Sequence, residues 1–357
     1  MTTITYHDLA SEYYMAYPLQ GLLTEARAHG CRMRISKNPP PILNNIHLSK
    51  KDNERLFALG IFQVTAGAST RWFCIDAHDD SSLEGYFRPV LKAVDHYFKL
   101  NEDPTAFEKD RELGGLKHKV HPLGCTFAIR PAMSWRFLPR LRPCKHYGWN
   151  WFSIKRRLRA LQRNPSMEWY RNLRSQPSDK DIFLVRRYYR DTDHAPSNQE
   201  CLRIFESLNH IAGISRHIGF TGTASTMPDS FHKYVFGPER SLRDHLTHMA
   251  RSRVGIFMPG TYNCLSFKFG QYLALGKPIV GMKLPFWPLT DMDPADKELL
   301  ESQFCCIEPE EIPAKLIDLL RDRARMDFLK TQNIRIFERY FSPQAVAARI
   351  LERVLPS

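Results

Sequence analysis

Two kinds of apolar spacing alternate along the second half of the chain, from residue 180 onward. Short continuous runs of β-branched and aromatic residues favour buried strands, and apolar residues three or four positions apart favour helices that cover a sheet. We therefore expect strands at 181–185, 216–222, 253–259, 277–282 and 304–307, and helices at 197–211, 239–252, 263–275, 310–332 and 342–355. This alternation is typical of a doubly wound parallel sheet, which binds ligands at the carboxyl ends of its strands.

The first half of the chain has a less regular pattern. Strands are expected at 31–36, 62–67, 71–76 and 119–124, and helices at 18–30 and 87–100. A chain of 357 residues is longer than most single domains, which indicates two domains. We predict an α/β fold with two facing Rossmann-like domains, at 1–135 and 179–357, joined by a linker at 136–178 and closed by a C-terminal helix.

The segment FGQYLALGKPIVG, at 269–281, predicts a tight joint between a helix and a strand. Gly276 suits the left-handed position just past a helix end, and Pro278 cannot continue the helix. Ile279 and Val280 then form the core of a strand. Such a short helix-to-strand connection favours parallel strands under covering helices.

The positive charge of the chain is concentrated in one window, at 130–190. That window holds 16 Lys and Arg against three acidic residues, so its net charge equals the +13 of the whole chain. Four of the six tryptophans also lie there, and Ile154, Leu158 and Leu161 follow helical spacing among Lys155, Arg156, Arg157, Arg159 and Arg163. Three interpretations stay open: a helix on an anionic membrane surface, a solvated basic linker helix, or a surface for nucleic acid or another polyanion.

The remaining composition sets the class of protein. Hydrophobic residues make up 43% of the chain, which excludes a disordered protein. The sequence opens without a basic and apolar leader, and its apolar runs are shorter than the roughly 20 residues that span a bilayer. Eight cysteines without a Cys-x-x-Cys pair favour free thiols in a reducing compartment. We expect a cytoplasmic protein, either soluble or peripheral on the inner face of a membrane.

One long segment resembles a known family. RVGIFMPGTYNCLSFKFGQYLALGKPIVG, at 253–281, is similar to the donor-binding segment of GT-B glycosyltransferases. The following MKLPFWP, CCIEPEEIPAKLIDLL and RIFERYFSPQAVAARIL keep that family's order, so the resemblance covers about 180–355. In the first half, VDHYFKLNE followed by KVHPLG resembles bacterial surface-polysaccharide glycosyltransferases. The resemblance implies an acceptor-side domain at 1–135 and a nucleotide-sugar donor domain at 179–357.

A nucleotide-sugar donor needs cations or backbone amides for its diphosphate and a polar side chain for its ribose. The candidates for binding the donor are Arg186, Arg187, Arg190, Gly260, Thr261, Ser266, Lys268 and Gln271. Gln271 stands where the family usually has a Glu that binds the ribose, and a neutral amide forfeits a charge-assisted hydrogen bond. The three arginines could instead be a surface cluster within the basic window.

A transferase that inverts the anomeric carbon needs a base for the acceptor hydroxyl. DAHDD, at 76–80, follows an expected strand, and we predict Asp79 as the base with His78 or Asp76 as the residue that orients it. The same cluster could serve only to cap a turn.

No metal site is expected. Asp291 and Asp293 match an Asp-x-Asp pattern but lie in a Pro-rich loop, and His245 and His248 lack an evident third ligand. The expected activity is metal-independent transfer of a sugar from a nucleotide-sugar donor to a glycan. The expected acceptor is lipid-linked, the nucleotide sugar is a substrate, and no cofactor is expected. The alternatives are glycosylation of DNA or protein, and a non-catalytic protein of the same fold that binds nucleotides or polyanions.

Overall fold

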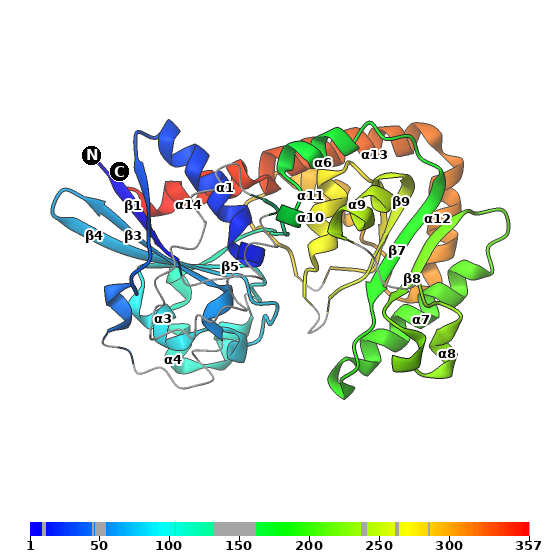
Figure 1. Ribbon diagram of the computed structural model, residues 1–357, viewed down its shortest axis with the longest axis horizontal. Coiled ribbons are helices and arrows are strands. Elements are labelled where there is room, and N and C mark those ends of the chain that lie inside the picture. The colour runs from blue at the N-terminus through cyan, green and yellow to red at the C-terminus, as the bar shows by residue number, and fades with distance from the viewer. Residues whose placement is uncertain are drawn as a thin grey trace. The chain divides into compact units, whose positions relative to one another are not determined.

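The computed structural model describes residues 1–8, 12–44, 46, 55–103, 105–130, 162–236, 241–260, 264–284 and 286–356. The chain forms two compact units, the first from 1–166, 286–290 and 339–357, and the second from 167–285 and 291–338. Each unit has its own sheet covered by helices (Figure 1). The predicted α/β class with two sheet-containing units is therefore confirmed.

The sheet of the first unit has six strands and one antiparallel member. Its order is β2-β1-β3-β4-β5-β6, and β3 runs antiparallel to both β1 and β4 while the other neighbours pair in parallel. All strands except β3 therefore end at the same edge of the sheet. The strands are β1 (Thr3–His7), β2 (Arg32–Ser36), β3 (Leu59–Ala66), β4 (Ser69–Asp76), β5 (His96–Lys99) and β6 (Val120–Pro122).

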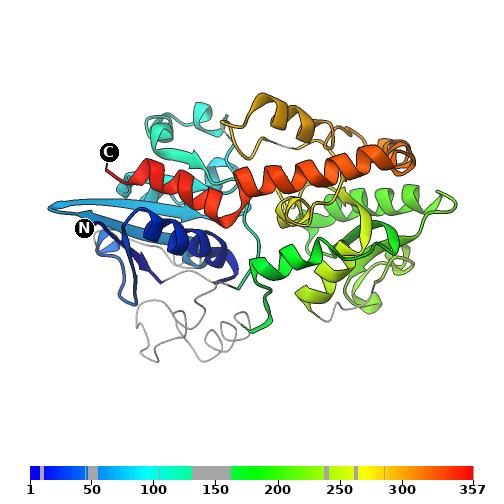
Figure 2. The ribbon, with the colours of Figure 1, turned by 90° about the horizontal axis from the view of Figure 1, so that it is seen from above.

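Helices cover both faces of this sheet. Helices α1 (Glu12–Ala28) and α14 (Pro343–Val354) lie along one face, as Figure 2 shows from above, and α3 (Arg88–Ala93) and α4 (Arg111–Gly114) lie on the other face. Gly21 lets α1 approach α14 closely, because a Cβ at this position would overlap with the Pro343 carbonyl. The Tyr17 hydroxyl of α1 also donates a hydrogen bond to the Phe341 carbonyl.

The packing of α14 differs from the predicted division of the chain. The range 179–357 was expected to form one domain, whereas 339–357 belongs to the first unit. The apolar stripe of α14, which includes Val346, Ile350 and Val354, is buried in that unit. Arg349 also donates a hydrogen bond to the Leu123 carbonyl at 3.2 Å.

The sheet of the second unit is entirely parallel, with the order β10-β9-β7-β8. Strand β7 begins the unit's sheet, and the chain then adds β8 on one side and β9 and β10 on the other. The order therefore reverses between β7 and β9, which is where parallel α/β sheets bind ligands. The strands are β7 (Lys180–Arg187), β8 (Arg216–Thr221), β9 (Ser252–Phe257) and β10 (Ile279–Gly281).

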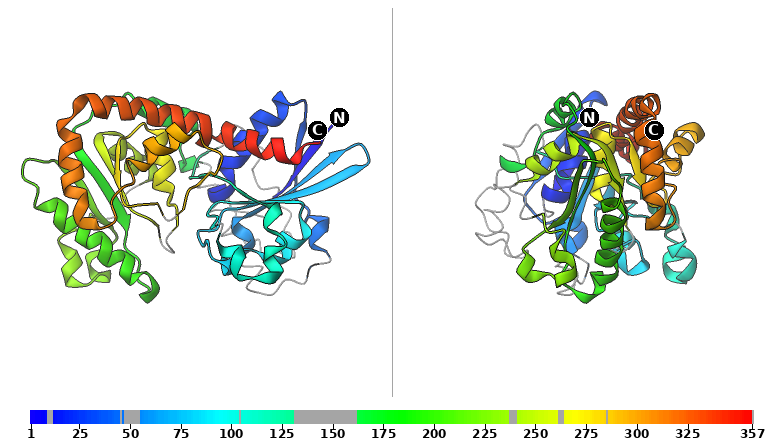
Figure 3. Two further views of the ribbon diagram at one scale, coloured as in Figure 1. Left: turned by 180° about the vertical axis from the view of Figure 1, so that it is seen from behind. Right: turned by 90° about the vertical axis from the view of Figure 1, so that its right-hand side faces the viewer.

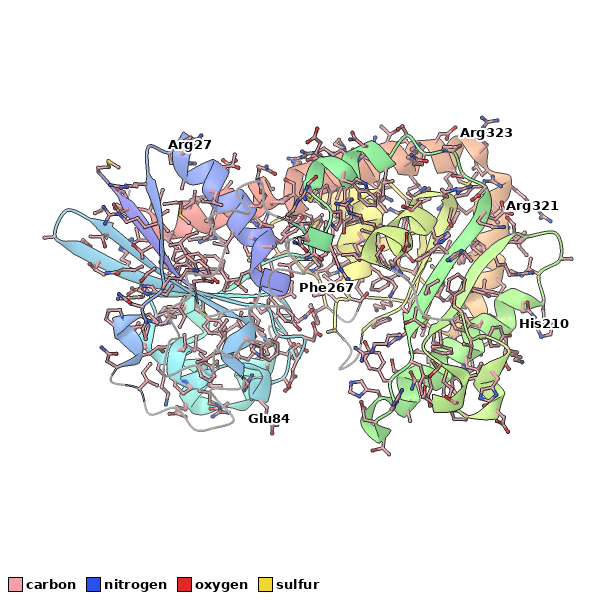
Figure 4. The ribbon with its side chains drawn as sticks, viewed as in Figure 1. Arg27, Glu84, His210, Phe267, Arg321 and Arg323 are labelled. Carbon is pink, nitrogen blue, oxygen red and sulfur yellow. The ribbon has the colours of Figure 1, made fainter. Side chains whose placement is uncertain are left out.

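Both faces of this sheet are buried, which explains the continuous apolar run of β7. Helices cover both faces of the sheet (Figure 3). Ile182 and Leu184 join the core formed with α7 (Ala195–Asn209) and α12 (Ile312–Arg321). On the other face, Phe183 contacts Tyr272 of α10 (Phe267–Ala274) and His245 of α9 (Leu242–Ala250). Helices α12 and α13 meet between the exposed side chains of Arg321 and Arg323 (Figure 4). The helices are α6 (Met167–Leu173), α7 (Ala195–Asn209), α8 (Asp229–His232), α9 (Leu242–Ala250), α10 (Phe267–Ala274), α11 (Pro294–Glu301), α12 (Ile312–Arg321) and α13 (Arg323–Ile336).

The joint between α10 and β10 is as predicted. Gly276 has a φ of +66°, and a Cβ there would lie 2.6 Å from the Ile334 side chain. The next residue, Lys277, is buried, and its Nζ donates hydrogen bonds to the carbonyls of Ala250 and Ser252. Lys277 therefore satisfies a carbonyl group at the end of α9.

Three expectations of secondary structure need correction. The predicted helix at 87–100 ends at Ala93, and the chain continues as β5, because parallel pairing with β4 outweighs local helical spacing. The predicted strand at 304–307 is reduced to a single bridge between Cys306 and Met282. Strand β1 has no counterpart among the predicted strands, although its buried Ile4 and Tyr6 alternate with the less buried Thr3 and Thr5.

The basic window falls partly outside the described residues, which omit 131–161. Most of the predicted amphipathic helix lies in that range, so it stays a prediction. Among the described residues, no helix is both long enough and apolar enough to cross a bilayer.

Candidate functional site

Polar and charged side chains gather where β4 and β5 of the first unit end. The two strands are parallel neighbours, and their register places Asp76 opposite Lys99. Both side chains are fully buried. Because a buried charge is costly unless it is paired, such a cluster needs an internal network of hydrogen bonds.

The Asp76 carboxylate is the centre of this network. It accepts hydrogen bonds from Nζ of Lys99 at 3.1 Å, from the Tyr97 hydroxyl, and from the backbone and side chain of His78. Burial opposes its ionisation, but the Lys99 ammonium and the hydrogen bonds from His78 and Tyr97 hold the pKa of Asp76 well below its usual range. Asp76 is therefore an anion at neutral pH.

The ionised state of Asp76 fixes the tautomer of His78. The distance from Nδ1 of His78 to Oδ1 of Asp76 is 2.7 Å, and a carboxylate can only accept, so Nδ1 carries the proton. In the neutral imidazole, Nε2 then holds the free lone pair. This Nε2 atom is buried and has no hydrogen-bond partner among the described residues. A buried polar atom without a partner needs an explanation, and a ligand hydroxyl would satisfy it.

Asp79 lies beside this pair but outside its hydrogen bonds. The predicted arrangement, with Asp79 oriented by His78 or Asp76, differs from the structure, in which Asp76 binds His78. Burial raises the pKa of Asp79, while the charges of Lys99 and His78 act in the opposite direction. No hydrogen bond to the Asp79 carboxylate is formed within the described part of the chain.

Two basic side chains hold the loop that follows β4 in place by binding its backbone carbonyls. Nζ of Lys99 donates to the carbonyls of His78 and Gly85, each at 3.2 Å, and Arg55 donates to the carbonyls of Glu84 and Gly85. Figure 4 labels Glu84 in this loop. A Cβ at Gly85 would overlap with the Asp80 carbonyl, so only glycine permits this close approach.

Sequence reasoning missed Lys99 and Tyr97 as members of the site. The available signal was a lysine at the end of the aromatic run HYFK, since a charged residue in an otherwise buried strand requires a partner. The assumption that 87–100 is helical concealed that signal.

In the second unit, Arg186 lies at the point where the strand order reverses. Its side chain is buried, and its guanidinium donates hydrogen bonds to the Pro259 carbonyl, at 3.2 Å, and to the Ser197 hydroxyl. These bonds connect the ends of β7 and β9 with the start of α7. Arg186 therefore fixes the loops around the predicted donor site through both terminal nitrogens of its guanidinium.

A pocket of about 780 Å³ opens at the carboxyl ends of β7 and β8. Arg187 and Arg190 line it, and neither forms an ion pair within the described part of the chain. The Arg187 guanidinium lies 5.9 Å from the ring centroid of Tyr189. The complete lining consists of Arg187, Tyr188, Tyr189, Arg190, Asp191, Thr221, Gly222, Thr223, Thr226 and Met227. Cations beside aromatic rings and hydroxyls suit an anionic ligand with a flat ring.

The first turns of α10 contain the other predicted donor residues. Ser266 is the N-cap residue, and its buried hydroxyl has no hydrogen-bond partner among the described residues. Lys268 is half-buried in the first turn, shortly after the labelled Phe267 (Figure 4), and Gln271 is 5% exposed in the second turn. Gly260 lies in the loop before this helix, and Thr261 lies outside the described residues.

The two metal patterns seen in the sequence have structural roles in the second unit. Asp293 caps α11 by accepting a hydrogen bond from the Ala295 amide at 3.0 Å. His245 packs edge-on against Phe183, and His248 stacks on His217. Among the described residues, no group of three or more His, Cys, Asp or Glu side chains is placed to hold a metal ion.

No protein-family model matches the chain, and no curated protein matches it either. Among solved structures, the chain is similar to Spinosyn Forosaminyltransferase SpnP, with a TM-score of 0.37 and 10% sequence identity over 99% of this chain and 98% of that one.

Proposed function

We propose that the protein is a glycosyltransferase that moves a sugar from a nucleotide-sugar donor to a hydroxyl group of a glycan, with His78 as the base. The observation that carries this proposal is the orientation of His78 by a buried, ionised Asp76, which leaves Nε2 unpaired. A neutral imidazole in this tautomer is suited to remove a proton from an alcohol. The role first assigned to Asp79 thus moves to its neighbour.

The reaction is a substitution at the anomeric carbon of the donor sugar. The acceptor oxygen forms the new bond to that carbon as its proton passes to Nε2 of His78. The bond from the anomeric carbon to the diphosphate breaks, and the nucleoside diphosphate leaves with the electron pair. Asp76 stabilises the imidazolium that forms, since its carboxylate already accepts the Nδ1 proton.

The second unit supplies the proposed donor site. Arg187 and Arg190 in the pocket, with Lys268 at the start of α10, are the proposed ligands of the diphosphate. These cations stabilise charge on the leaving group, which is the task that a metal ion performs in metal-dependent transferases. Gln271 is the proposed ligand of the ribose, because its buried amide can both donate to and accept from hydroxyl groups.

The proposed acceptor is a lipid-linked glycan at the inner face of a membrane, as in synthesis of a cell-surface polysaccharide. This part rests on the basic window, whose cations and tryptophans suit an anionic lipid surface. A polyanion such as DNA is the competing partner for the same charges.

A screen with a matched variant tests the function. Thermal unfolding is measured with UDP-, GDP- and dTDP-linked sugars, and one of these is expected to stabilise the protein. His78→Gln should then lower kcat for transfer by about 100-fold or more without changing donor affinity. The control is His29→Gln, since His29 is exposed at the end of α1. Stabilisation by nucleic acid alone, or full activity in His78→Gln, would contradict the proposal.

A further inference from the structure

The pairing of β3 with β4 brings an aromatic side chain next to His78. The register pairs Leu59 with Asp76, and the Ala77 amide donates to the Ala58 carbonyl at 3.0 Å, so the antiparallel alignment continues past the strand ends. One step further, Phe57 stands opposite His78. Their ring centroids are 5.6 Å apart and the rings meet edge-on at 70°.

Phe57 is unusual because its side chain is 47% exposed although it lies beside a buried network. Tyr14, in the first turn of α1, contacts the same ring at a centroid distance of 5.4 Å. Helix α1 follows β1, whose carboxyl end is at the same edge of the sheet as the end of β4. Phe57 thus lies against the imidazole, and Tyr14 from a different element lies against Phe57.

The Phe57 ring and Nε2 of His78 place an apolar face beside a polar atom that has no hydrogen-bond partner among the described residues. This Nε2 atom is buried. Phe57 is the exposed ring in contact with that imidazole. A ligand that fits needs a hydroxyl for Nε2 and C–H groups for the aromatic rings, and a pyranose ring carries both.

We propose that Phe57 and Tyr14 form an acceptor subsite for a hexopyranose ring, which packs its C–H face on Phe57 and directs a hydroxyl to Nε2 of His78. This inference rests on the proposed function, for which it names the class of group that receives the sugar. The subsite lies wholly in the first unit, so it is separable from donor binding in the second unit.

Saturation-transfer NMR with methyl β-D-galactopyranoside and methyl β-D-glucopyranoside tests the subsite directly. We expect the wild-type protein to bind at least one of them, with saturation strongest at the C–H protons of one ring face. Phe57→Ala should weaken that binding by about 3- to 10-fold, the scale of one aromatic contact, and Phe57→Trp should retain it. In transfer assays with the bound glycoside as acceptor, Phe57→Ala should raise KM by the same factor and leave kcat unchanged.

Phe328→Ala is the matched control, because Phe328 is 52% exposed and lies on α13 of the second unit. It should leave glycoside binding and transfer unchanged. Absence of glycoside binding to the wild-type protein, equal binding by Phe57→Ala, or preferential binding of a planar phenol such as p-cresol would each overturn the subsite. Glycoside binding that depends on Phe57 without any nucleotide-sugar binding would instead support the subsite and contradict the transferase.

Discussion

Nζ of Lys99 donates a hydrogen bond to the Asp76 carboxylate 3.1 Å away, and neither side chain is exposed to solvent. Lys99 also binds the carbonyls of His78 and Gly85, so the same ammonium joins β5 to the loop that carries the proposed base. The pair therefore has two tasks. It neutralises the anion that orients His78, and it fixes the path of the loop.

Removal of one member of this pair should destabilise the protein strongly. Lys99→Met or Asp76→Asn should each lower the free energy of unfolding by about 3–5 kcal/mol, because one partner is left buried and unpaired. The double variant should lose less than the sum of the two single losses. Urea unfolding of the four proteins measures this coupling, and strict additivity would show that the two side chains act independently.

Lys277 should make the free energy of unfolding depend on pH in the alkaline range. Burial, with a smaller contribution from Lys330, lowers the pKa of Lys277 from 10.5 to about 7. Between these two pH values, Lys277 is protonated in the unfolded chain and neutral in the folded chain. The contribution of Lys277 to the free energy of unfolding therefore rises with pH. Urea unfolding from pH 7 to 10 should show this rise in the wild type and a smaller one in Lys277→Met. Identical slopes in both proteins would contradict the shift.

Gly276 is expected to tolerate no side chain. Gly276→Ala combines a positive φ with a Cβ only 2.6 Å from Ile334, and we expect a loss of about 2–4 kcal/mol in the free energy of unfolding. Gly213→Ala is the matched control, since Gly213 has a φ of +73° with open space around it. That change should cost only about 1 kcal/mol. Equal losses of unfolding free energy in the two variants would show that the contact with Ile334 adds nothing to the cost of the positive φ.

The start of α10 is expected to govern donor affinity. Lys268→Ala should weaken binding of a nucleoside diphosphate by about 1.5–3 kcal/mol, the scale of a hydrogen bond to a charged group. Gln271→Glu should keep or improve it, because a carboxylate accepts stronger hydrogen bonds from ribose hydroxyls. Titration calorimetry measures both. Unchanged affinity in Lys268→Ala would remove that residue from the site, and a large loss in Gln271→Glu would place the ribose elsewhere.

The basic window should determine the kind of surface that the protein binds. Changing Arg156, Arg157 and Arg159 to Glu should release the protein from vesicles rich in phosphatidylserine, since each cation near such a surface contributes about 1 kcal/mol. Transfer to a short water-soluble acceptor should persist, because His78 and the donor residues are unchanged. Vesicle sedimentation at low and high salt measures the binding. Failure to bind vesicles, together with salt-dependent binding to duplex DNA, would favour the alternative partner.

The sequence by itself determined the elements whose signals are local. The alternation of strands and helices after residue 180 followed from apolar spacing, and the joint at Gly276 and Pro278 followed from backbone restrictions that neighbouring residues impose. The cluster at 76–80 was also visible as a site candidate, because its polar residues follow a buried strand.

Tertiary structure alone decided which partners these residues meet. Strand β5 forms because β4 offers a parallel ladder, and only that pairing places Lys99 opposite Asp76. Helix α14 joins the first unit because Gly21 leaves room for it on α1, more than 300 positions earlier in the chain. The choice of His78 over Asp79 as the proposed base depends on a 2.7 Å hydrogen bond, whose geometry no spacing of residues along the sequence contains. Local patterns encode backbone conformation, whereas pairing across the fold depends on the packing of segments that are distant in sequence.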